Sequence, residues 1–328
     1  MAKKEEKKVE LKDVLAGISK ELGEGAINYA QEEMGSLEVI PFSIPSVNRI
    51  TGIGGVPRGR LTEFHGMDGT FKTTFTLDLI KNAQSMGITC AFIDAEFSYS
   101  PEYAEKLGVD NSKLILVKPN SAEEAFGVME KLIDSGQVEC IVLDSIAALS
   151  PETELENEFG KSNIGVMARL MNQALRKLTA KAGKNNVALI FINQLREMLG
   201  GYVPMKTTPG GNGVRFYASM RFEISKSQVK DGTDVIGVNL KVKCVKNKLA
   251  TPYLIAEVEA IYGVGIDVQK DLINECVEAG ILSKAGAGWL QLAEGVKVQG
   301  LDNAKQFLID NPEFEQELIN KLKEQNGQ

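Results

Sequence analysis

The sequence feature that most constrains the fold is the stretch HGMDGTFKTTF, residues 65–75. It follows the phosphate-loop pattern G-x-x-x-x-G-K-[ST] from Gly66 to Lys72 and Thr73, except that Phe71 occupies the position of the second glycine. Such a loop connects a strand to the first turn of a helix, because backbone N–H groups and the helix N-terminus must point at the phosphates. A chance polar turn is the alternative, and the flanking sequence decides between the two.

The segments on both sides of the loop have an α/β pattern. RLTEFHG leads into the loop as a strand, and residues 72–87 continue as a helix that ends at Gly87. Three more apolar runs predict buried strands: ITCAFIDAE, VECIVLD and NVALIFINQ. Because these runs do not alternate polar and apolar residues, they indicate a mostly parallel, twisted sheet with both faces covered. After residue 213, strand-like runs joined by tight turns predict antiparallel additions to that sheet.

The two ends of the chain differ from this central region. Residues 9–22 carry one apolar stripe at helical spacing, which packs either on the chain's own core or on another subunit. From about residue 266 the pattern is mixed and contains the single tryptophan, Trp289. We therefore predict three parts: an N-terminal helix and linker (residues 1–36), an α/β core (residues 37–265) and a small α+β domain (residues 266–328).

Composition narrows the function classes. The net charge of −7 argues against a general nucleic-acid coat, so any polyanion binding must come from local patches. The N-terminus lacks a secretory signal and no apolar run reaches the ~18 residues of a membrane span, so we expect a cytoplasmic protein with no membrane partner. Cys90 and Cys140 lie in apolar runs and are expected to be reduced core cysteines, and a structural role is favoured for His65.

Polar residues lie at the carboxyl ends of the predicted strands. Ligands of open α/β sheets bind at this edge. Lys72 would reach the β- and γ-phosphates, and Thr73 would hold Mg²⁺. Asp144 ends the run IVLD, a suitable position for a carboxylate that holds the metal through water. Glu96 ends a third strand and could activate the attacking water, although a solvated carboxylate is the alternative and Asp94 lies in the same run.

The cost of Phe71 depends on its backbone conformation. If the loop requires a positive φ there, a non-glycine residue costs about 1–2 kcal/mol, which weakens a site without abolishing it. Gly69, two residues earlier, is expected to take part of the strain.

Six longer motifs connect these residues to a known family: TCAFIDAE, YAEKLGVD, IVLDSIAAL, LIFINQLR, GGNGVRFYAS and VKNKLATPY. Over roughly residues 10–320 the chain resembles the RecA recombinases, the bacterial strand-exchange ATPases. The resemblance implies a RecA-like P-loop ATPase core, an N-terminal helix that packs on the neighbouring protomer, and a small C-terminal domain. It also implies a DNA-dependent ATPase that uses ATP and Mg²⁺, forms a helical filament on single-stranded DNA and exchanges strands with a homologous duplex.

The resemblance assigns roles to individual residues of the nucleotide site. Glu96 activates water, Gln194 senses the γ-phosphate and signals to the DNA-binding loop after it, and Tyr103 stacks on adenine. Lys246 and Lys248 reach the neighbour's ATP, and their spacing of two puts both on one face of a strand. The nucleotide-binding residues it implies are Gly66, Met67, Asp68, Gly69, Thr70, Phe71, Lys72, Thr73, Thr74, Tyr103 and Asp144.

The resemblance also implies a DNA site formed by two loops, residues 157–164 and 195–209. Arg169, Asn172 and Arg176 share one helix face. Hydrophobic residues of the loops, Ile164 with Leu199 or Val203, would wedge between stretched bases. The full set of implied DNA-binding residues is Ile164, Gly165, Arg169, Asn172, Arg176, Arg196, Leu199, Gly210, Gly211 and Asn212. A basic inner groove of this kind is compatible with an acidic protein.

The sequence departs from the common bacterial pattern at two positions of the nucleotide site. Ser100 replaces an aspartate near adenine, which affects nucleotide selectivity. A phenylalanine at the position of Phe71 also occurs in T-even-type phage recombinases, so we expect the cytoplasm to be that of a bacterium or of a phage-infected host.

Two alternative functions stay open. One is an ATP-gated DNA-binding scaffold that hardly hydrolyses ATP, and the other is a ring-forming RecA-fold motor. The paired lysines of VKNK, the N-terminal helix and the GGN loop favour the filament.

Overall fold

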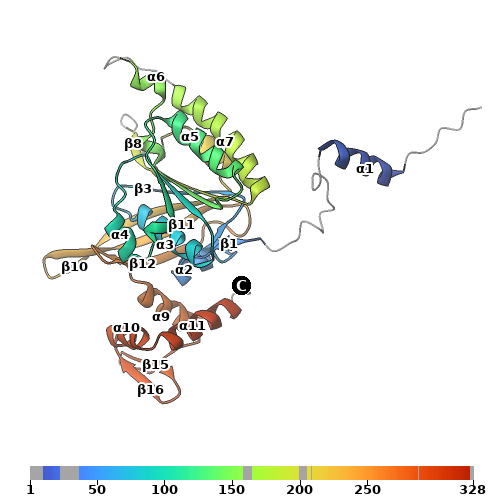
Figure 1. Cartoon of the computed structure of the whole chain (residues 1–328). Coiled ribbons are helices and arrows are strands. Elements are labelled where there is room, and N and C mark those ends of the chain that lie inside the picture. The colour runs from blue at the N-terminus through green and yellow to red at the C-terminus, as the bar shows by residue number, and fades with distance from the viewer. Residues whose placement is uncertain are drawn as a thin grey trace, which may run out of the picture. The chain divides into compact units, whose positions relative to one another are not determined.

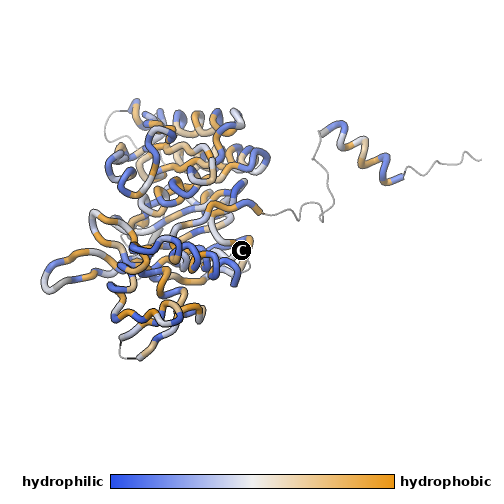
Figure 2. Tube along the Cα trace, turned by 60° about the horizontal axis from the view of Figure 1, so that its bottom comes forward, coloured by the Kyte–Doolittle hydropathy of each residue, from blue (hydrophilic) through white to orange (hydrophobic). Residues whose placement is uncertain are grey.

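A computed structural model describes residues 10–22, 37–157, 165–198, 205–207, 209–286 and 288–325. The chain separates into two units, Met1–Glu38 and Val39–Gln328. The first unit contains helix α1 (Leu11–Leu22), which confirms the helix expected there. Hydrophobic and hydrophilic residues alternate along α1 (Figure 2), as expected for an amphipathic helix whose apolar stripe needs a partner.

The second unit is organised around a nine-stranded sheet in the order β13-β12-β11-β10-β3-β7-β6-β4-β5 (Figure 1). Strands from β10 to β5 pair in parallel, whereas β10 to β13 pair antiparallel. This confirms a parallel core with antiparallel additions. The strands are β3 (Leu61–Gly66), β4 (Cys90–Asp94), β5 (Leu114–Val117), β6 (Cys140–Asp144), β7 (Ala188–Gln194), β10 (Met220–Asp231), β11 (Asp234–Asn247), β12 (Ile255–Ile261) and β13 (Gly265–Ile266).

Helices cover both faces of this sheet, with an apolar core on each side. One core contains Phe64 of β3 and Ile190 of β7, and the other contains Leu189 and Phe191, the neighbours of Ile190 on β7. Successive strand residues point to opposite faces, so a strand buried on both faces is apolar at nearly every position. The first face is covered by α2 (Pro45–Thr51), α3 (Lys72–Ser85) and α4 (Pro101–Lys106), and the second by α5 (Ala122–Asp134), α7 (Val166–Asn185) and α8 (Gly213–Tyr217).

Shorter elements complete the core. These are β1 (Val39–Ile40) paired with β2 (Val56–Pro57), β8 (Arg196–Met198) paired with β9 (Met205–Thr207), α6 (Glu152–Leu155), and single 3₁₀ turns at Asn111–Lys113 and Ile146–Ala148. The four cysteines are free and buried, which confirms the expectation for Cys90 and Cys140. Among the described residues, no helix combines the length and the apolar character that crossing a bilayer requires.

The C-terminal part has its own small core. Its elements are α9 (Val268–Glu278), β14 (Ser283–Lys284), β15 (Trp289–Ala293), β16 (Val296–Gln299), α10 (Leu301–Asp310) and α11 (Pro312–Gln325). Leucines such as Leu272, Leu308 and Leu318 pack together between its helices and its three-stranded sheet. This arrangement agrees with a small α+β domain in this region, while the exact boundary at residue 266 stays a prediction.

Polar contacts between α2 and α9 attach this C-terminal part to the core. The backbone N–H of Ser46 donates to Asp271 Oδ2 at 2.9 Å, and Arg49 makes a two-pronged ion pair with Glu275 at 2.6 and 2.9 Å. Asp271 is 5% exposed. Burial raises the pKa of Asp271 to about 7, with Glu275 adding to the rise and the Ser46 hydrogen bonds and Arg49 opposing it.

The raised pKa of Asp271 predicts a pH-dependent stability. Between about pH 4 and pH 7 the native carboxyl holds a proton that the unfolded chain has released, so stability falls as pH rises, by roughly 2–4 kcal/mol, and then levels off. Asp271→Asn should remove this fall and make the protein more stable than the wild type at pH 8. Urea unfolding at pH 5, 6, 7 and 8 measures both, with the exposed Asp302→Asn as control. An unchanged pH slope in Asp271→Asn contradicts the prediction.

Candidate functional site

The phosphate loop begins at the end of β3 and leads directly into α3. Gly66 is required by space, because a Cβ there would lie 2.5 Å from the carbonyl oxygen of Ile224 on β10. Phe71 precedes the helix with φ 59° and ψ 24°, the left-handed conformation that costs a non-glycine residue about 1–2 kcal/mol. Gly69 also has a positive φ, 66°. The loop therefore does require a positive φ at Phe71, the condition under which the sequence analysis expects a cost.

Lys72 is folded back into the loop. Its ammonium donates to the carbonyl oxygens of Met67 at 2.9 Å and Gly66 at 3.2 Å. Burial lowers the pKa of Lys72, while the carboxylates of Asp68, Asp144 and Glu96 oppose the shift. The cation thus lies where the strand, the loop and the helix N-terminus meet, the position from which a P-loop lysine reaches phosphate oxygens.

Thr73 and Asp144 form the part of the site that fits a magnesium ion. The Thr73 hydroxyl donates to Asp144 Oδ2 at 2.6 Å, which joins α3 to the end of β6. Burial raises the pKa of Asp144 to about 6, the Thr73 hydrogen bond opposes this, and Glu96 and Asp94 add to it. A hydroxyl and a carboxylate in contact are hard oxygen ligands of the kind that Mg²⁺ prefers.

Glu96 and Gln194 meet beside this pair. Gln194 Nε2 donates to Glu96 Oε1 at 3.1 Å, and the Ser145 hydroxyl donates to the same oxygen. Asp94, the alternative carboxylate, accepts instead from the backbone N–H groups of Ser98 and Tyr99 at 3.0 and 3.1 Å. Both carboxylates accept two hydrogen bonds, but Asp94 is fully buried whereas Glu96 is exposed, so Glu96 is the one that a water or ligand can reach.

Tyr103 is attached to the first turn of α3. Its hydroxyl shares a hydrogen bond of 3.0 Å with the hydroxyl of Thr74. Ser100 caps α4 by accepting from the backbone N–H of Tyr103 at 3.2 Å. Since aspartate is an equally good N-cap, the serine preserves the local geometry around Tyr103 while removing a charge.

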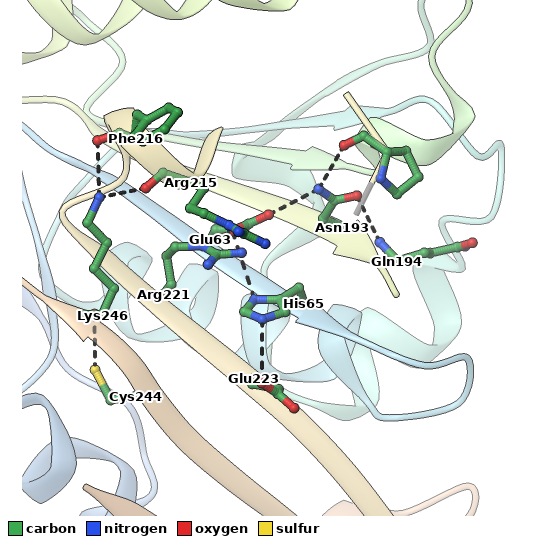
Figure 3. A network of polar contacts seen from close by, with 11 residues as sticks. Glu63, His65, Asn193, Gln194, Arg215, Phe216, Arg221, Glu223, Cys244 and Lys246 are labelled. Carbon is green, nitrogen blue, oxygen red and sulfur yellow. Dashed lines mark hydrogen bonds and ion pairs between the residues drawn. The ribbon is translucent and has the colours of Figure 1, made fainter. Parts of the chain in front are cut away.

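A buried polar network includes the backbone of Gln194 (Figure 3). Asn193 donates to Glu63 Oε1 at 3.0 Å and to the carbonyl oxygen of Pro209 at 3.3 Å, and it accepts from the backbone N–H of Gln194 at 3.0 Å. Arg221 donates through Nε to the other oxygen of Glu63. Glu63 and Asn193 are fully buried. The network joins the predicted γ-phosphate sensor to the residue that ends the second predicted DNA loop.

The sequence analysis missed Glu63, Asn193 and Arg221, although each is a polar residue within a strand of the buried sheet. His65 also lies next to this network, with Nδ1 3.9 Å from Glu63. Burial lowers the pKa of His65 to about 4, so the ring is neutral at pH 7, which agrees with a structural role.

Lys246 lies near the end of β11, and Lys248 follows the last residue of that strand, Asn247. The backbone N–H of Lys248 bonds to the carbonyl oxygen of Ser219 at 2.9 Å, in the register that pairs Met220 with Asn247. The expectation that both lysines share one face stays a prediction. Lys246 donates to the carbonyl oxygens of Arg215 at 2.6 Å and Phe216 at 3.0 Å (Figure 3).

Electrostatics set Lys246 apart from an ordinary surface lysine. Partial burial lowers the pKa of Lys246 to about 8, with Lys248 and Arg221 adding to the shift and Glu63 opposing it. A cation held close to other cations is a favourable partner for an anion that approaches from outside.

Several of the predicted DNA-binding residues gather on α7 and on the glycine turn that follows β9. Arg169, Asn172 and Arg176 lie on α7, and Gly165 precedes the helix with φ 80°. Gly210 and Gly211 have φ 85° and 75°, and a Cβ on Gly211 would lie 3.2 Å from Ala168 of α7. Asn212 precedes α8. The turn therefore packs against the helix face that carries Asn172.

The remaining predicted DNA-binding residues belong to the two loops. Ile164 and Leu199 lie outside the described residues, as do residues 158–163, Val203 and Thr208. Arg196 is in β8, where the backbone is described.

A groove of about 560 Å³ brings together Arg176, one of the DNA candidates, and Lys248, one of the lysine pair. Arg60, Arg176 and Lys248 line it together with Tyr217 and Ser219, and no carboxylate is among its described lining residues. Arg60, which directly precedes β3, was not predicted. Despite its negative net charge, the protein thus has a local cationic surface beside α7.

The loop, the strand-end residues and the mixed sheet define a P-loop protein with a RecA-like α/β core. The model of the RecA N-terminal domain matches residues 9–267, and that of the RecA C-terminal domain matches residues 270–327. The chain belongs to the RecA family. As a member, it is a recombinase that acts in homologous recombination and DNA repair.

Curated relatives match over nearly the whole chain. Protein RecA of Paenarthrobacter aurescens (strain TC1) is 42% identical over 100% of this chain and 95% of the relative. Protein RecA of Thermus aquaticus is 44% identical over 98% of this chain and 95% of the relative. Protein RecA of Thermus thermophilus is 43% identical over 99% of this chain and 96% of the relative.

The buried network predicts that Asn193→Ala destabilises the protein by about 1–3 kcal/mol, because Glu63 Oε1 and the Gln194 N–H lose their hydrogen bonds to Asn193. Thr62→Val on the same strand as Glu63 is a matched control. The Thr62 hydroxyl is buried without a partner, so its removal should be neutral or stabilising. Urea unfolding measures both variants. Equal effects of the two changes would show that the network contributes no stability of its own.

Proposed function

We propose that this recombinase is a DNA-dependent ATPase that forms filaments on single-stranded DNA and drives pairing and strand exchange with a homologous duplex. One observation carries the proposal. Lys72, Thr73, Glu96, Asp144 and Gln194 come from four separate segments and gather at the carboxyl edge of neighbouring strands, as a nucleotide hydrolase requires. Family membership supplies the reaction class.

Each residue of the nucleotide site has a task in this mechanism. The loop from Gly66 to Thr74 binds ATP with Lys72 on its β- and γ-phosphates, and Tyr103 stacks on the base. Thr73 and Asp144, the latter through water, would hold Mg²⁺, which would neutralise charge on the phosphates. Glu96 takes a proton from the attacking water.

Gln194 links the nucleotide to DNA in the proposed mechanism. Its side chain bonds to Glu96, and its backbone bonds to Asn193, which holds Pro209 at the end of the second loop. A γ-phosphate that draws the Gln194 side chain away from Glu96 would therefore act both on Glu96 and, through Asn193, on Pro209. ATP binding favours the DNA-binding state and hydrolysis releases it, which is a shift of population between two states.

DNA binding in the proposal is independent of sequence. Arg169, Asn172, Arg176 and Arg196 contact the phosphates, and backbone N–H groups of Gly165, Gly210, Gly211 and Asn212 add further contacts. Ile164 and Leu199 separate stretched bases. The cationic groove beside α7 supports this proposal, because phosphate binding needs local rather than net positive charge.

Assembly completes the site. Lys246 and Lys248 act on the neighbour's ATP as an arginine finger does, so hydrolysis depends on the filament. The helix within residues 1–36 packs on the neighbouring protomer, residues 37–265 form the ATPase and DNA-binding core, and residues 266–328 form the C-terminal domain. We place this filament in the cytoplasm of a bacterium or of a phage-infected host.

Phe71 supports a second candidate, an ATP-gated scaffold with weak hydrolysis. Its left-handed backbone is strained, and the strain lies directly before the lysine that contacts the phosphates. The rate of ATP hydrolysis distinguishes this scaffold from the DNA-dependent ATPase.

The first test is ATP hydrolysis with and without single-stranded DNA. We expect DNA to stimulate turnover strongly, and Lys72→Ala to lower it by about 10²-fold or more, because a preorganised cation at the phosphates is lost. A phosphate-release assay measures both. If ATP supports tight DNA binding while turnover stays at the level of Lys72→Ala, the ATPase proposal is wrong and the scaffold stands.

Catalysis across the protomer interface predicts complementation between two inactive variants. Lys72→Ala lacks the phosphate lysine and Lys246→Ala lacks the neighbour-facing lysine, so each alone should be inactive. In a random equal mixture about a quarter of the interfaces combine an intact loop with an intact Lys246, and DNA-dependent turnover should return to about that fraction. As control, Lys72→Ala mixed with the Lys72→Ala/Lys246→Ala double variant should stay inactive. A mixture of the two single variants without recovery would place Lys246 in its own protomer's site.

A further inference from the structure

The first three carbonyl groups of the phosphate loop each accept a hydrogen bond from a lysine. The carbonyl oxygens of Gly66 and Met67 accept from Lys72. The carbonyl oxygen of Asp68 accepts from the ammonium of Lys226 on β10 at 2.7 Å. Because the C=O and N–H of a trans peptide point in opposite directions, each of these bonds also sets the direction of the N–H that follows.

The N–H groups that come next in the loop are free donors. Within the part of the chain that the structure describes, no backbone N–H from Gly69 to Lys72 donates a hydrogen bond. Gly69 and Phe71, which lie in this segment, have left-handed backbones. Successive free N–H groups in such a turn form a concave site for an anion. The first donor of this site, the N–H of Gly69, belongs to the same peptide as the carbonyl that Lys226 holds.

Lys226 reaches the loop because β10 extends beyond the end of β3. β3 ends at Gly66, which pairs with Ile224, whereas β10 continues to Asp231. Lys226 lies two residues after Ile224 and therefore on the same face of the strand. Its ammonium is so close to the loop that a Cβ on Gly69 would lie 2.6 Å from it.

The two lysines differ in what a bound phosphate requires of them. Lys72 must leave the carbonyls of Gly66 and Met67 when it contacts phosphate oxygens. Lys226 comes from another strand and can keep its bond to Asp68 in both states. No carboxylate among the described residues pairs with Lys226, so the loop carbonyl is its partner. A hydrogen bond from an ammonium is stronger than one between neutral groups.

We propose that Lys226 is a positioning residue of the nucleotide site. Its bond to the Asp68 carbonyl turns the N–H of Gly69 toward the phosphates and maintains the shape of the loop when Lys72 moves onto ATP. The proposal rests on the proposed ATP site.

Nucleotide binding by the full chain tests the proposal. The readouts are the Kd of a fluorescent ATP analogue without DNA, and KM and kcat for ATP with single-stranded DNA. Lys226→Met keeps the length of the side chain but removes the donor. It should raise Kd and KM about 3- to 10-fold, the range for one net hydrogen bond, with a smaller change in kcat. Lys226→Arg retains a cationic donor and should bind within about 2-fold of the wild type.

A matched variant and a change of salt control for the loss of charge. Lys241→Met removes an exposed lysine from the paired strand β11, whose partner is Glu257 at 4.0 Å, and should leave Kd unchanged. The weakening by Lys226→Met should persist at high salt, which screens distant exposed charges but not a hydrogen bond to the loop. Thermal unfolding without nucleotide verifies that all the variants fold.

The outcomes separate this inference from the proposed function. If Lys226→Met binds the ATP analogue like the wild type, or if its defect disappears at high salt, Lys226 does not position the loop and the inference is wrong. If Lys226→Met raises Kd as expected while not even the wild type hydrolyses ATP, the ATPase proposal fails and the role of Lys226 stands. A wild type that does not bind the analogue overturns both.

Discussion

The buried carboxylate of Glu63 is the interaction on which the arrangement of the site depends. It lies on β3, which pairs in parallel with β7 and with β10, the strand at which the antiparallel additions begin. Its two oxygens accept from Asn193 of β7 on one side and Arg221 of β10 on the other. Removing either partner leaves a buried charge incompletely compensated, which is strongly destabilising. The registers of β7 and β10 relative to the phosphate loop are therefore fixed by hydrogen bonds as well as by apolar packing.

Much of the fold and part of the site were predictable from the sequence, because local patterns carry them. Continuous apolar runs identified the parallel strands, and the polar residues that end them identified Lys72, Asp144 and Glu96 as neighbours. What escaped prediction depends on contacts between distant segments. Tyr262 meets Phe71 from a turn far along the chain, and Lys226 meets Asp68 from 158 positions away. The periodicity of a local segment cannot predict contacts between residues so far apart in the sequence.

The end of β11 is a further feature that depends on distant segments. A spacing of two implies a shared face only while the strand continues, and the backbone of Lys248 bonds to Ser219, which precedes β10. The sequence VKNK contains no signal for that pairing. Conversely, the strain at Phe71 could be stated as a condition before the structure was known, because the left-handed cost is a property of the residue itself.

The antiparallel strands therefore do more than widen the sheet. β10 carries Lys226 to the phosphate loop, and β11, paired with it from Asn247 to Asp234, carries Lys246 to the opposite end. The turn after β12 adds Tyr262. Two hydrogen-bonded strands transmit displacement better than a loop does, because bending them breaks ladder bonds. In the proposed assembly, a force on Lys246 from a neighbouring protomer would thus reach the backbone of Asp68 through β10. In the proposed ATP site, a loop without its second glycine would then take its geometry from the sheet and would not depend on the loop's own flexibility.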